Sequence, residues 1–214
     1  MAIRNETIGL MDDAINAIGK EYNEISICEL GNQRTKDELN YKTGKEYLEA
    51  AGSKHLSIDL NGLDGAIALD LSKPVDKYHG HFDMVTNYGT TEHVGNQYEV
   101  FKNIHNFTKK GGAMVHASPL APYWYYHGNC NYEFEFYKNL AEANDYKVII
   151  SNMVRHSNQD VELYILCYVL IKENNNPFVS PVDFKNIRGI VENDDERKKQ
   201  WREEMKQKKL NKNK

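Results

Sequence analysis

The sequence lacks a long hydrophobic run. Nowhere do about 18 apolar residues follow one another, which is the length that a membrane-spanning helix requires. The amino-terminal segment MAIRNETIGL also has no apolar stretch after its arginine, so it does not look like a secretory leader. These two absences predict a cytoplasmic protein that does not enter a membrane.

Cysteine and proline are scarce. The chain has 3 cysteines and 5 prolines among its 214 residues. The cysteines are odd in number and far apart, and two of them lie in apolar runs, where a thiol packs like a small hydrophobic group. We therefore expect no disulfide framework. With 40% hydrophobic residues, the composition is that of an ordinary globular protein.

An excess of positive charge is also missing. The formal net charge is −4 and the isoelectric point is near 6.1. A protein that binds the phosphate backbone of a nucleic acid normally needs a basic face. The composition therefore disfavours a nucleic-acid partner, and it leaves the oligomeric state open, a homo-oligomer included.

Apolar spacing predicts alternating strands and helices along the first four fifths of the chain. The pattern predicts helices over 8–18, 36–51, 97–107 and 132–144, and strands over 25–30, 55–60, 65–71, 82–88, 113–119, 146–151 and 160–172. Such alternation is typical of a largely parallel sheet with helices on both faces. We expect one domain over 1–176, and a polar linker and charged tail over 177–214.

Chemically distinctive residues gather where the predicted strands end. Glu29 and Gly31 close the first strand, and Asp59, Asp70 and Asn87 close the next three. In an open parallel sheet, ligands bind beside the carboxyl ends of the strands. Carboxylates there can accept the hydroxyls of a ribose, and a glycine lets the backbone approach the ligand. The same carboxylates repel a pyrophosphate and favour a positively charged ligand.

An ordered series of motifs resembles the class I S-adenosylmethionine-dependent methyltransferases. The resemblance covers roughly residues 24–172 and rests on the segments ISICELG, LSIDL, IALDLS, FDMVTNYGTTEHV and KKGGAMVHASP. It implies a Rossmann-like α/β fold with a mostly parallel sheet of seven strands, or a slightly trimmed one. It also implies S-adenosylmethionine as the cofactor, held by Glu29, Gly31, Asn32, Asp59, Asp70, Leu71, Asn87 and Tyr88.

The sequence departs from the family pattern at two places. Gln33 stands where the family usually has a second glycine, so the opening loop must follow another path or be partly filled by this side chain. Asp59 and Asp70 are close together in sequence, which leaves little room for the helix that the family places between these strands. The edge of the sheet is therefore expected to be trimmed.

Histidines and aromatic residues supply the candidates for catalysis and acceptor binding. His93 and His127 are the candidate general bases, because histidine titrates near neutral pH, and His116 is a weaker candidate. Tyr123, Trp124 and Tyr126 belong to an aromatic segment that could wall an acceptor pocket. His116, His127 and Cys130 have poor spacing for a metal site, so no metal is predicted.

Three functions are compatible with these residues. The first is methyl transfer to a small-molecule or glycan acceptor, at oxygen if a histidine base operates. The second is a methyltransferase-like subunit that binds a partner without catalysis. The third is a nicotinamide-dependent oxidoreductase, but its fingerprint needs three glycines and GNQRTK supplies one. Methylation of a nucleobase amino group is disfavoured, because enzymes of that kind carry paired prolines at this motif and the segment NYGT has none.

Overall fold

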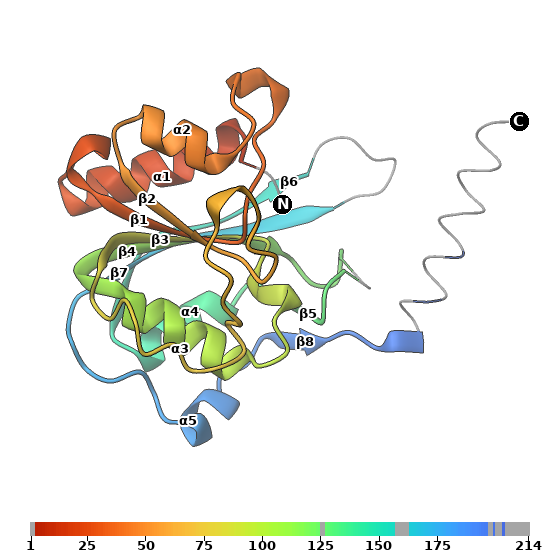
Figure 1. The fold of residues 1–214 in the computed structure, drawn as a ribbon. Coiled ribbons are helices and arrows are strands. Elements are labelled where there is room, and N and C mark those ends of the chain that lie inside the picture. Colours follow the sequence, from red (N-terminus) through yellow and green to blue (C-terminus); the bar gives the residue numbers. More distant parts are fainter. Residues whose placement is uncertain (1–2, 125–126, 157–162, 197–198, 200–202, 204–214) are drawn as a thin grey trace, which may run out of the picture.

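The structure is a computed structural model, which describes residues 3–124, 127–156, 163–196, 199 and 203. Figure 1 shows a central sheet with helices on both of its faces. The sheet order is β2-β1-β3-β4-β7-β6. Its strands are β1 (Ser26–Leu30), β2 (Lys54–Ile58), β3 (Phe82–Tyr88), β4 (Thr108–Pro119), β6 (Tyr146–Arg155) and β7 (Tyr164–Lys172).

The direction of the strands changes at β7. Neighbouring strands from β2 to β4 run parallel, whereas β7 runs antiparallel to both β4 and β6. The prediction of a mostly parallel sheet is therefore confirmed. Of the two predicted sizes, seven strands or a slightly trimmed sheet, the structure has the trimmed one. Within the described residues the sheet has six strands.

The missing strand is the one predicted over 65–71. This segment meets the edge strand β2 through a single bridge between Ile58 and Ile67. A parallel crossover needs a dozen or more residues, and the turn here, with Gly62 and Gly65 at φ values of 61° and 83°, is much shorter. The trimmed edge expected from the spacing of Asp59 and Asp70 follows from this short connection.

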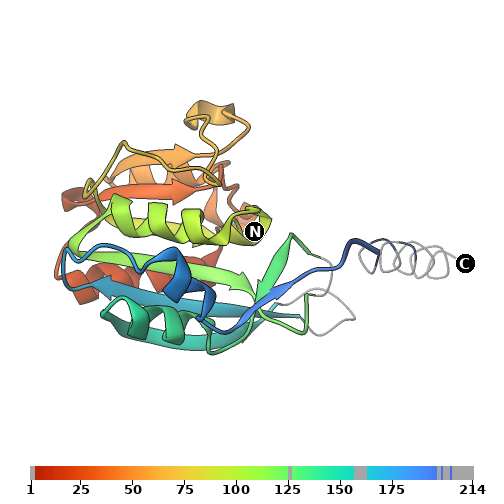
Figure 2. The same ribbon diagram turned by 90° about the horizontal axis from the view of Figure 1, so that it is seen from below.

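Each face of the sheet is covered by its own helices. On one face lie α1 (Asn5–Ile18) and α2 (Gly44–Ala50). On the other lie α3 (Gln97–Phe107) and α4 (Phe136–Ala143), which Figure 2 shows running along the sheet. Two separate hydrophobic clusters result, one under each set of helices. The buried residues of α1, at positions 7, 10, 11, 14 and 15, follow the predicted helical spacing.

Two predicted helices are shorter in the structure than in the sequence pattern. The helix predicted over 36–51 is reduced to α2 and a single 3-10 turn, Asp37–Leu39. Gly44 is the first residue of α2, and a side chain at this position would collide with the carboxylate of Glu29. The helix predicted from residue 132 begins at Phe136, because residues Cys130–Tyr132 form the short strand β5.

The chain continues to pack against the domain beyond residue 176. The side chains of Phe178 and Phe184 are buried in the same hydrophobic cluster as α3 and α4. Phe184 belongs to α5 (Pro181–Lys185), and the following strand β8 (Ile190–Glu192) pairs antiparallel with β5. The domain boundary at 176 remains a prediction. Within the described part of the chain, no helix combines the length and apolar character needed to cross a bilayer.

Candidate functional site

An open hollow of about 360 Å³ lies at the carboxyl ends of the parallel strands. The loop after β1, the end of β2, the segment around residue 70 and the loop after β3 form its walls. Its size is within the range of about 300–1,000 Å³ that is usual for small-molecule pockets. Five of the residues predicted from the sequence line it, namely Gly31, Asp59, Asp70, Leu71 and His93.

Gly31 allows the opening loop to turn sharply after β1. Its φ of 84° is in the left-handed region, which favours glycine. A Cβ at this position would lie 2.6 Å from both Gln33 Nε2 and Thr90 Oγ1. The Gln33 side chain is buried, lines the hollow and donates a hydrogen bond to the carbonyl of Leu30 at 3.3 Å. The expectation that this side chain partly fills the loop is confirmed.

The two aspartates that line the hollow are both held by backbone amides. Asp59 accepts hydrogen bonds from the amides of Asn32, at 2.8 Å, and Asn61, at 2.9 Å. Asp70 accepts hydrogen bonds from the hydroxyl of Ser72 at 2.6 Å and from its amide at 3.0 Å, which lower the pKa of its carboxyl. Asp70 therefore stays ionised at neutral pH, and Lys73 Nζ, 3.3 Å from Asp70 Oδ2, is its ion-pair partner at this wall of the hollow.

Glu29 does not reach the hollow. Its side chain is 1% exposed, and Oε2 accepts a hydrogen bond from His55 Nε2 at 3.1 Å. Burial raises the pKa of Glu29, and the neighbouring His55 opposes this effect. Of the three carboxylates expected in one crevice, Asp59 and Asp70 share it, whereas Glu29 forms a buried pair below α2.

Asn87 and Tyr88 are adjacent in β3, so their side chains point to opposite faces of the sheet. Tyr88 is fully buried in the cluster under α1, where its hydroxyl donates to the carbonyl of Thr7 at 2.9 Å. The structure therefore places the Tyr88 side chain away from the hollow. Asn87 is also fully buried, on the face that carries α3.

Asn87 fixes the loop that follows β3. Its Oδ1 accepts hydrogen bonds from the amides of Thr90, at 3.2 Å, and Thr91, at 3.1 Å. Its Nδ2 donates to the hydroxyl of Thr91 at 2.9 Å and lies 3.2 Å from His116 Nδ1. These contacts make Asn87 a positioning residue for the short 3-10 turn Thr91–His93. The His116 side chain is buried, and its Nδ1 is in contact with the Asn87 amide.

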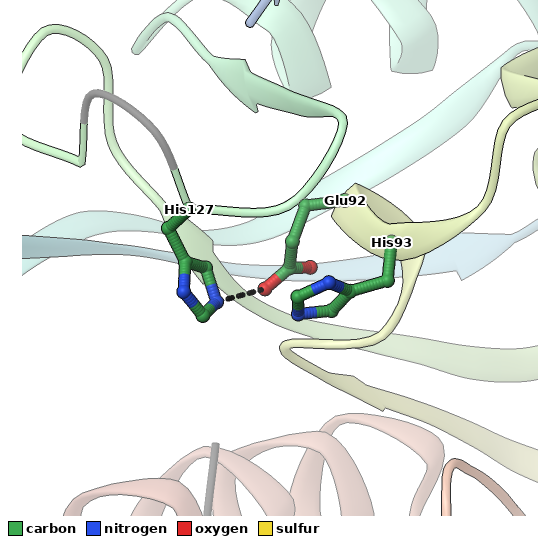
Figure 3. A group of neighbouring side chains, drawn as sticks. All are labelled: Glu92, His93 and His127. Atoms are coloured by element: carbon green, nitrogen blue, oxygen red, sulfur yellow. Dashed lines mark ion pairs between the residues drawn. The ribbon is translucent and has the colours of Figure 1, made fainter. Parts of the chain in front are cut away.

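The side chains of Glu92, His93 and His127 lie close together (Figure 3), and His93 lines the hollow. The ring centroids of the two histidines are 4.8 Å apart, and His127 Nε2 lies 3.7 Å from Glu92 Oε1. The Glu92 side chain is fully buried, and neither carboxylate oxygen accepts a hydrogen bond within the described structure. Glu92 had no role in the sequence prediction. An acid directly before a histidine at a strand end is the signal that could have identified it.

Burial changes the pKa values of these three residues. It raises the pKa of Glu92 to about 7 and lowers the pKa of His93. It also lowers the pKa of His127 to about 4, with a further contribution from the neighbouring His93. From the sequence, both histidines are expected to titrate near neutral pH. The structure instead makes them neutral imidazoles at pH 7, which suits hydrogen-bond acceptors better than strong bases.

A second hollow, of about 240 Å³, also borders this group. Its lining residues are Arg4, Lys36, Glu92, Pro119, Trp124, His127 and His156. Two of the residues predicted near the acceptor, Trp124 and His127, therefore share one hollow. Tyr123 does not line it, because its ring packs 4.6 Å from that of Tyr164. Tyr126 lies outside the described residues.

Comparison with solved structures identifies the fold. No family model matches the chain, and no curated protein matches it in sequence. The structure of the 1,6-didemethyltoxoflavin-N1-methyltransferase from Burkholderia thailandensis, with 1,6-didemethyltoxoflavin and S-adenosylhomocysteine bound, superimposes with a TM-score of 0.56. The chain has the class I methyltransferase fold. The superposition covers 79% of this chain and 79% of that one, at 13% identity.

A second structure supports the same methyltransferase fold. It is a putative S-adenosylmethionine-dependent methyltransferase from Listeria monocytogenes, which superimposes with a TM-score of 0.54 at 10% identity. The superposition covers 77% of this chain and all of that one, 100%. Likeness at this level of identity concerns the fold alone. The larger hollow lies at the carboxyl edge of the sheet, which is the usual ligand edge of an open α/β fold.

Proposed function

We propose that this protein is an S-adenosylmethionine-dependent methyltransferase that acts on a small-molecule or glycan acceptor, at an oxygen atom. One observation carries the proposal: in a methyltransferase fold, Gly31, Asp59 and Asp70 line one hollow at the carboxyl edge of the sheet. The cofactor, when bound, supplies an activated methyl group on a positively charged sulfur.

The residues of the larger hollow fit such a cofactor. Asp70 keeps a negative charge, and its side chain is 38% exposed, so it is accessible to the adenosyl portion of a ligand. Asp59 offers a second carboxylate, and Gly31 brings the backbone of the opening loop to the same hollow. Paired carboxylates favour a cationic ligand and disfavour a pyrophosphate, which argues against a nicotinamide dinucleotide.

The smaller hollow is the proposed acceptor site. Trp124 gives it an apolar wall, while Arg4, Lys36 and His156 surround it with polar groups. His93 lines the cofactor hollow and His127 lines the acceptor hollow, so an acceptor hydroxyl at the border would meet both. A neutral imidazole there accepts a hydrogen bond from the hydroxyl and orients its oxygen toward the cofactor. Tyr123 and Tyr126 remain predictions.

A binding subunit without catalysis is the second candidate. The observation that favours it is the Gln33 side chain, which occupies the space beside Gly31 where the family usually has only backbone. Such a protein would keep the fold and the hollow but bind the cofactor weakly. Cofactor binding and methyl transfer must therefore be measured separately.

Calorimetry on the full-length protein tests the cofactor site. We expect S-adenosylhomocysteine to bind in the micromolar range and NAD not to bind. The variant Asp70→Asn should weaken binding about tenfold to a hundredfold, because a hydrogen bond to a charged group contributes about 1.5–3 kcal/mol. The control Asp76→Asn removes an exposed carboxylate that does not line the hollow, and it should bind like the wild type.

The outcomes separate the three functions. Binding of neither ligand would contradict the methyltransferase proposal, and binding of NAD alone would favour the oxidoreductase. If the protein binds S-adenosylhomocysteine, labelled S-adenosylmethionine with panels of sugars and small hydroxylated compounds then tests catalysis. Cofactor binding without methyl transfer to any acceptor would support the binding subunit.

A further inference from the structure

We propose that Glu92, His93 and His127 form a binding site for a divalent first-row transition-metal ion. Two imidazole nitrogens and one carboxylate oxygen are donors that Zn²⁺, Co²⁺ and Mn²⁺ accept. This is not the group that the sequence disfavours as a metal site, which is His116, His127 and Cys130. Among the described residues, Glu92, His93 and His127 are the only group of three such side chains close enough to share an ion.

The distances between the three donors suit a metal ion. The ligand atoms all lie within 4.8 Å of one another. Metal–nitrogen bonds of about 2.0–2.1 Å place neighbouring ligands of a tetrahedral ion about 3.4 Å apart. His127 Nε2 and Glu92 Oε1, at 3.7 Å, are already near this separation. A small rotation of the His93 ring, which is the most exposed of the three, completes the approach.

The buried carboxylate of Glu92 is the second observation that points to an ion. Its side chain has no exposed surface, and neither oxygen accepts a hydrogen bond. Buried carboxylates without hydrogen-bond donors or a counter-charge are strongly disfavoured. Figure 3 shows the carboxylate directed between the two imidazole rings. Arg4 and Lys36 line the same hollow, but among the described residues no lysine or arginine forms an ion pair with Glu92. A cation at this position would supply the missing partner.

The backbone holds the three residues together before any ion binds. The amide of Asn129 donates to the carbonyl of Glu92 at 2.6 Å, and its side chain donates to the carbonyl of His93 at 2.8 Å. Gly128 packs so closely that a Cβ there would lie 2.6 Å from the carbonyl oxygen of Glu92. The turn Thr91–His93 and the loop of His127 therefore form one unit. Such support for metal-binding residues increases metal affinity.

The position of the site suggests what the ion would do. Glu92 and His127 line the acceptor hollow, and His93 lines the cofactor hollow, so the ion would lie on the border between them. With the ion bound, the acceptor nitrogens of His93 and His127 would be its ligands, so an acceptor oxygen would be held at an open coordination position instead of by hydrogen bonds to these imidazoles. This role rests on the proposed methyl transfer, whereas the metal site itself does not.

Cobalt titration of the full-length protein, freed of metal with a chelator, tests the site. Co²⁺ bound by two imidazoles and a carboxylate gives a visible absorption band, and we expect one equivalent to bind. Zn²⁺ should displace it. The variants His127→Gln and Glu92→Gln should weaken Co²⁺ binding at least about tenfold, as expected for lost metal contacts. The control His81→Gln removes an exposed imidazole outside the site and should bind like the wild type.

Circular dichroism of each variant confirms that it is folded before metal is added. Absence of a Co²⁺ band in the wild type, or equal losses in His127→Gln and His81→Gln, would overturn the proposal and leave Glu92 as a structural partner of His127. The calorimetry with S-adenosylhomocysteine is done without metal, so the two proposals fail separately. Cofactor binding without Co²⁺ binding would contradict only the metal-site proposal. Co²⁺ binding without cofactor binding would contradict only the methyltransferase proposal.

Discussion

At the scale of single residues, one buried amide supports the loop on which both proposals depend. Asn87 satisfies two backbone amides and one hydroxyl of the loop that carries Glu92 and His93. An apolar side chain at this position could replace none of these hydrogen bonds. The Thr91 hydroxyl would keep its hydrogen bond from Tyr132, but the amides of Thr90 and Thr91 would lose their acceptor, which costs more than the bonds themselves contribute.

The variant Asn87→Ala should therefore lower the free energy of unfolding by about 3 kcal/mol, the cost of leaving buried polar groups unsatisfied. Urea unfolding measures this change. The control Asn16→Ala removes an exposed amide from α1 and should change the stability by less than about 0.5 kcal/mol. Equal stabilities for the two variants would show that Asn87 does not brace the loop.

The residues at the site show how far sequence reasoning reaches. Apolar runs predicted where β1 and β2 end, and Gly31 and Asp59 lie there. Asp70 lines the same hollow, although the strand predicted before it does not form. The direction of each side chain was not predictable in the same way. Glu29 is covered by residues that a strand pattern does not reveal, namely His55 on β2 and Gly44 at the start of α2.

At the scale of elements, Asp83 ties together the beginnings of three strands. It accepts hydrogen bonds from Lys20, at 2.6 Å, from the amide of Ser26 in β1, at 2.9 Å, and from Lys109 in β4, at 2.9 Å. Burial alone would raise the pKa of Asp83, but these hydrogen bonds outweigh it and hold the pKa well below its usual range. The ionised form is thus stabilised by folding.

The sign of the pH effect follows directly. A carboxyl whose pKa is lower in the folded state stabilises the fold above its unfolded pKa of about 3.9, and this contribution is lost as the pH falls. We expect Asp83→Asn to lower the free energy of unfolding by about 2 kcal/mol at pH 7. The difference from wild type should shrink between pH 5 and pH 3.

Urea unfolding at several pH values measures this dependence. The variant Asp13→Asn, which changes an exposed carboxylate on α1, is the matched control and should follow the wild type at every pH. A constant difference between Asp83→Asn and the wild type from pH 7 to pH 3 would contradict the assignment.

Long, strongly patterned elements were the ones that the sequence predicted well. The strand over 82–88 and the helix over 97–107 have the predicted bounds. All seven residues of β3 are buried, as in a central strand, and the apolar residues of α3 recur at helical spacing. The strand predicted over 65–71 failed for a reason outside the segment itself. Its apolar residues are typical of a strand, but the short connection after β2 prevents a parallel ladder.

At the scale of the whole molecule, the carboxy-terminal segment is connected to the site. β8 pairs with β5, and Asn193 then donates from its side chain to the carbonyl of His127 at 2.8 Å and from its amide to that of Asn129 at 2.8 Å. Figure 1 shows β5 and β8 near the end of the central sheet. A segment that was expected to be a polar linker therefore fixes the loop of a site residue.

Two shortened chains test this connection. A chain of residues 1–196 keeps β8 and Asn193, and we expect it to unfold at the same temperature as the full protein. A chain of residues 1–188 loses them and should unfold about 4–8 °C lower, the shift that about 2 kcal/mol produces in a domain of this size. Thermal unfolding followed by circular dichroism measures the difference. Identical midpoints for the two chains would show that β8 is dispensable.

The strand β3 has its acid-sensitive anchor, Asp83, at one end and Asn87, which supports the site, at the other. These residues share no hydrogen-bond partner, and changes at well-separated positions usually have additive effects. Ligand recognition could therefore change during evolution without weakening the attachment of the opposite edge. Conversely, changes at the contacts of Asp83 with Lys20 and Lys109 could alter the stability of the protein at acidic pH while its preference for a ligand stays the same.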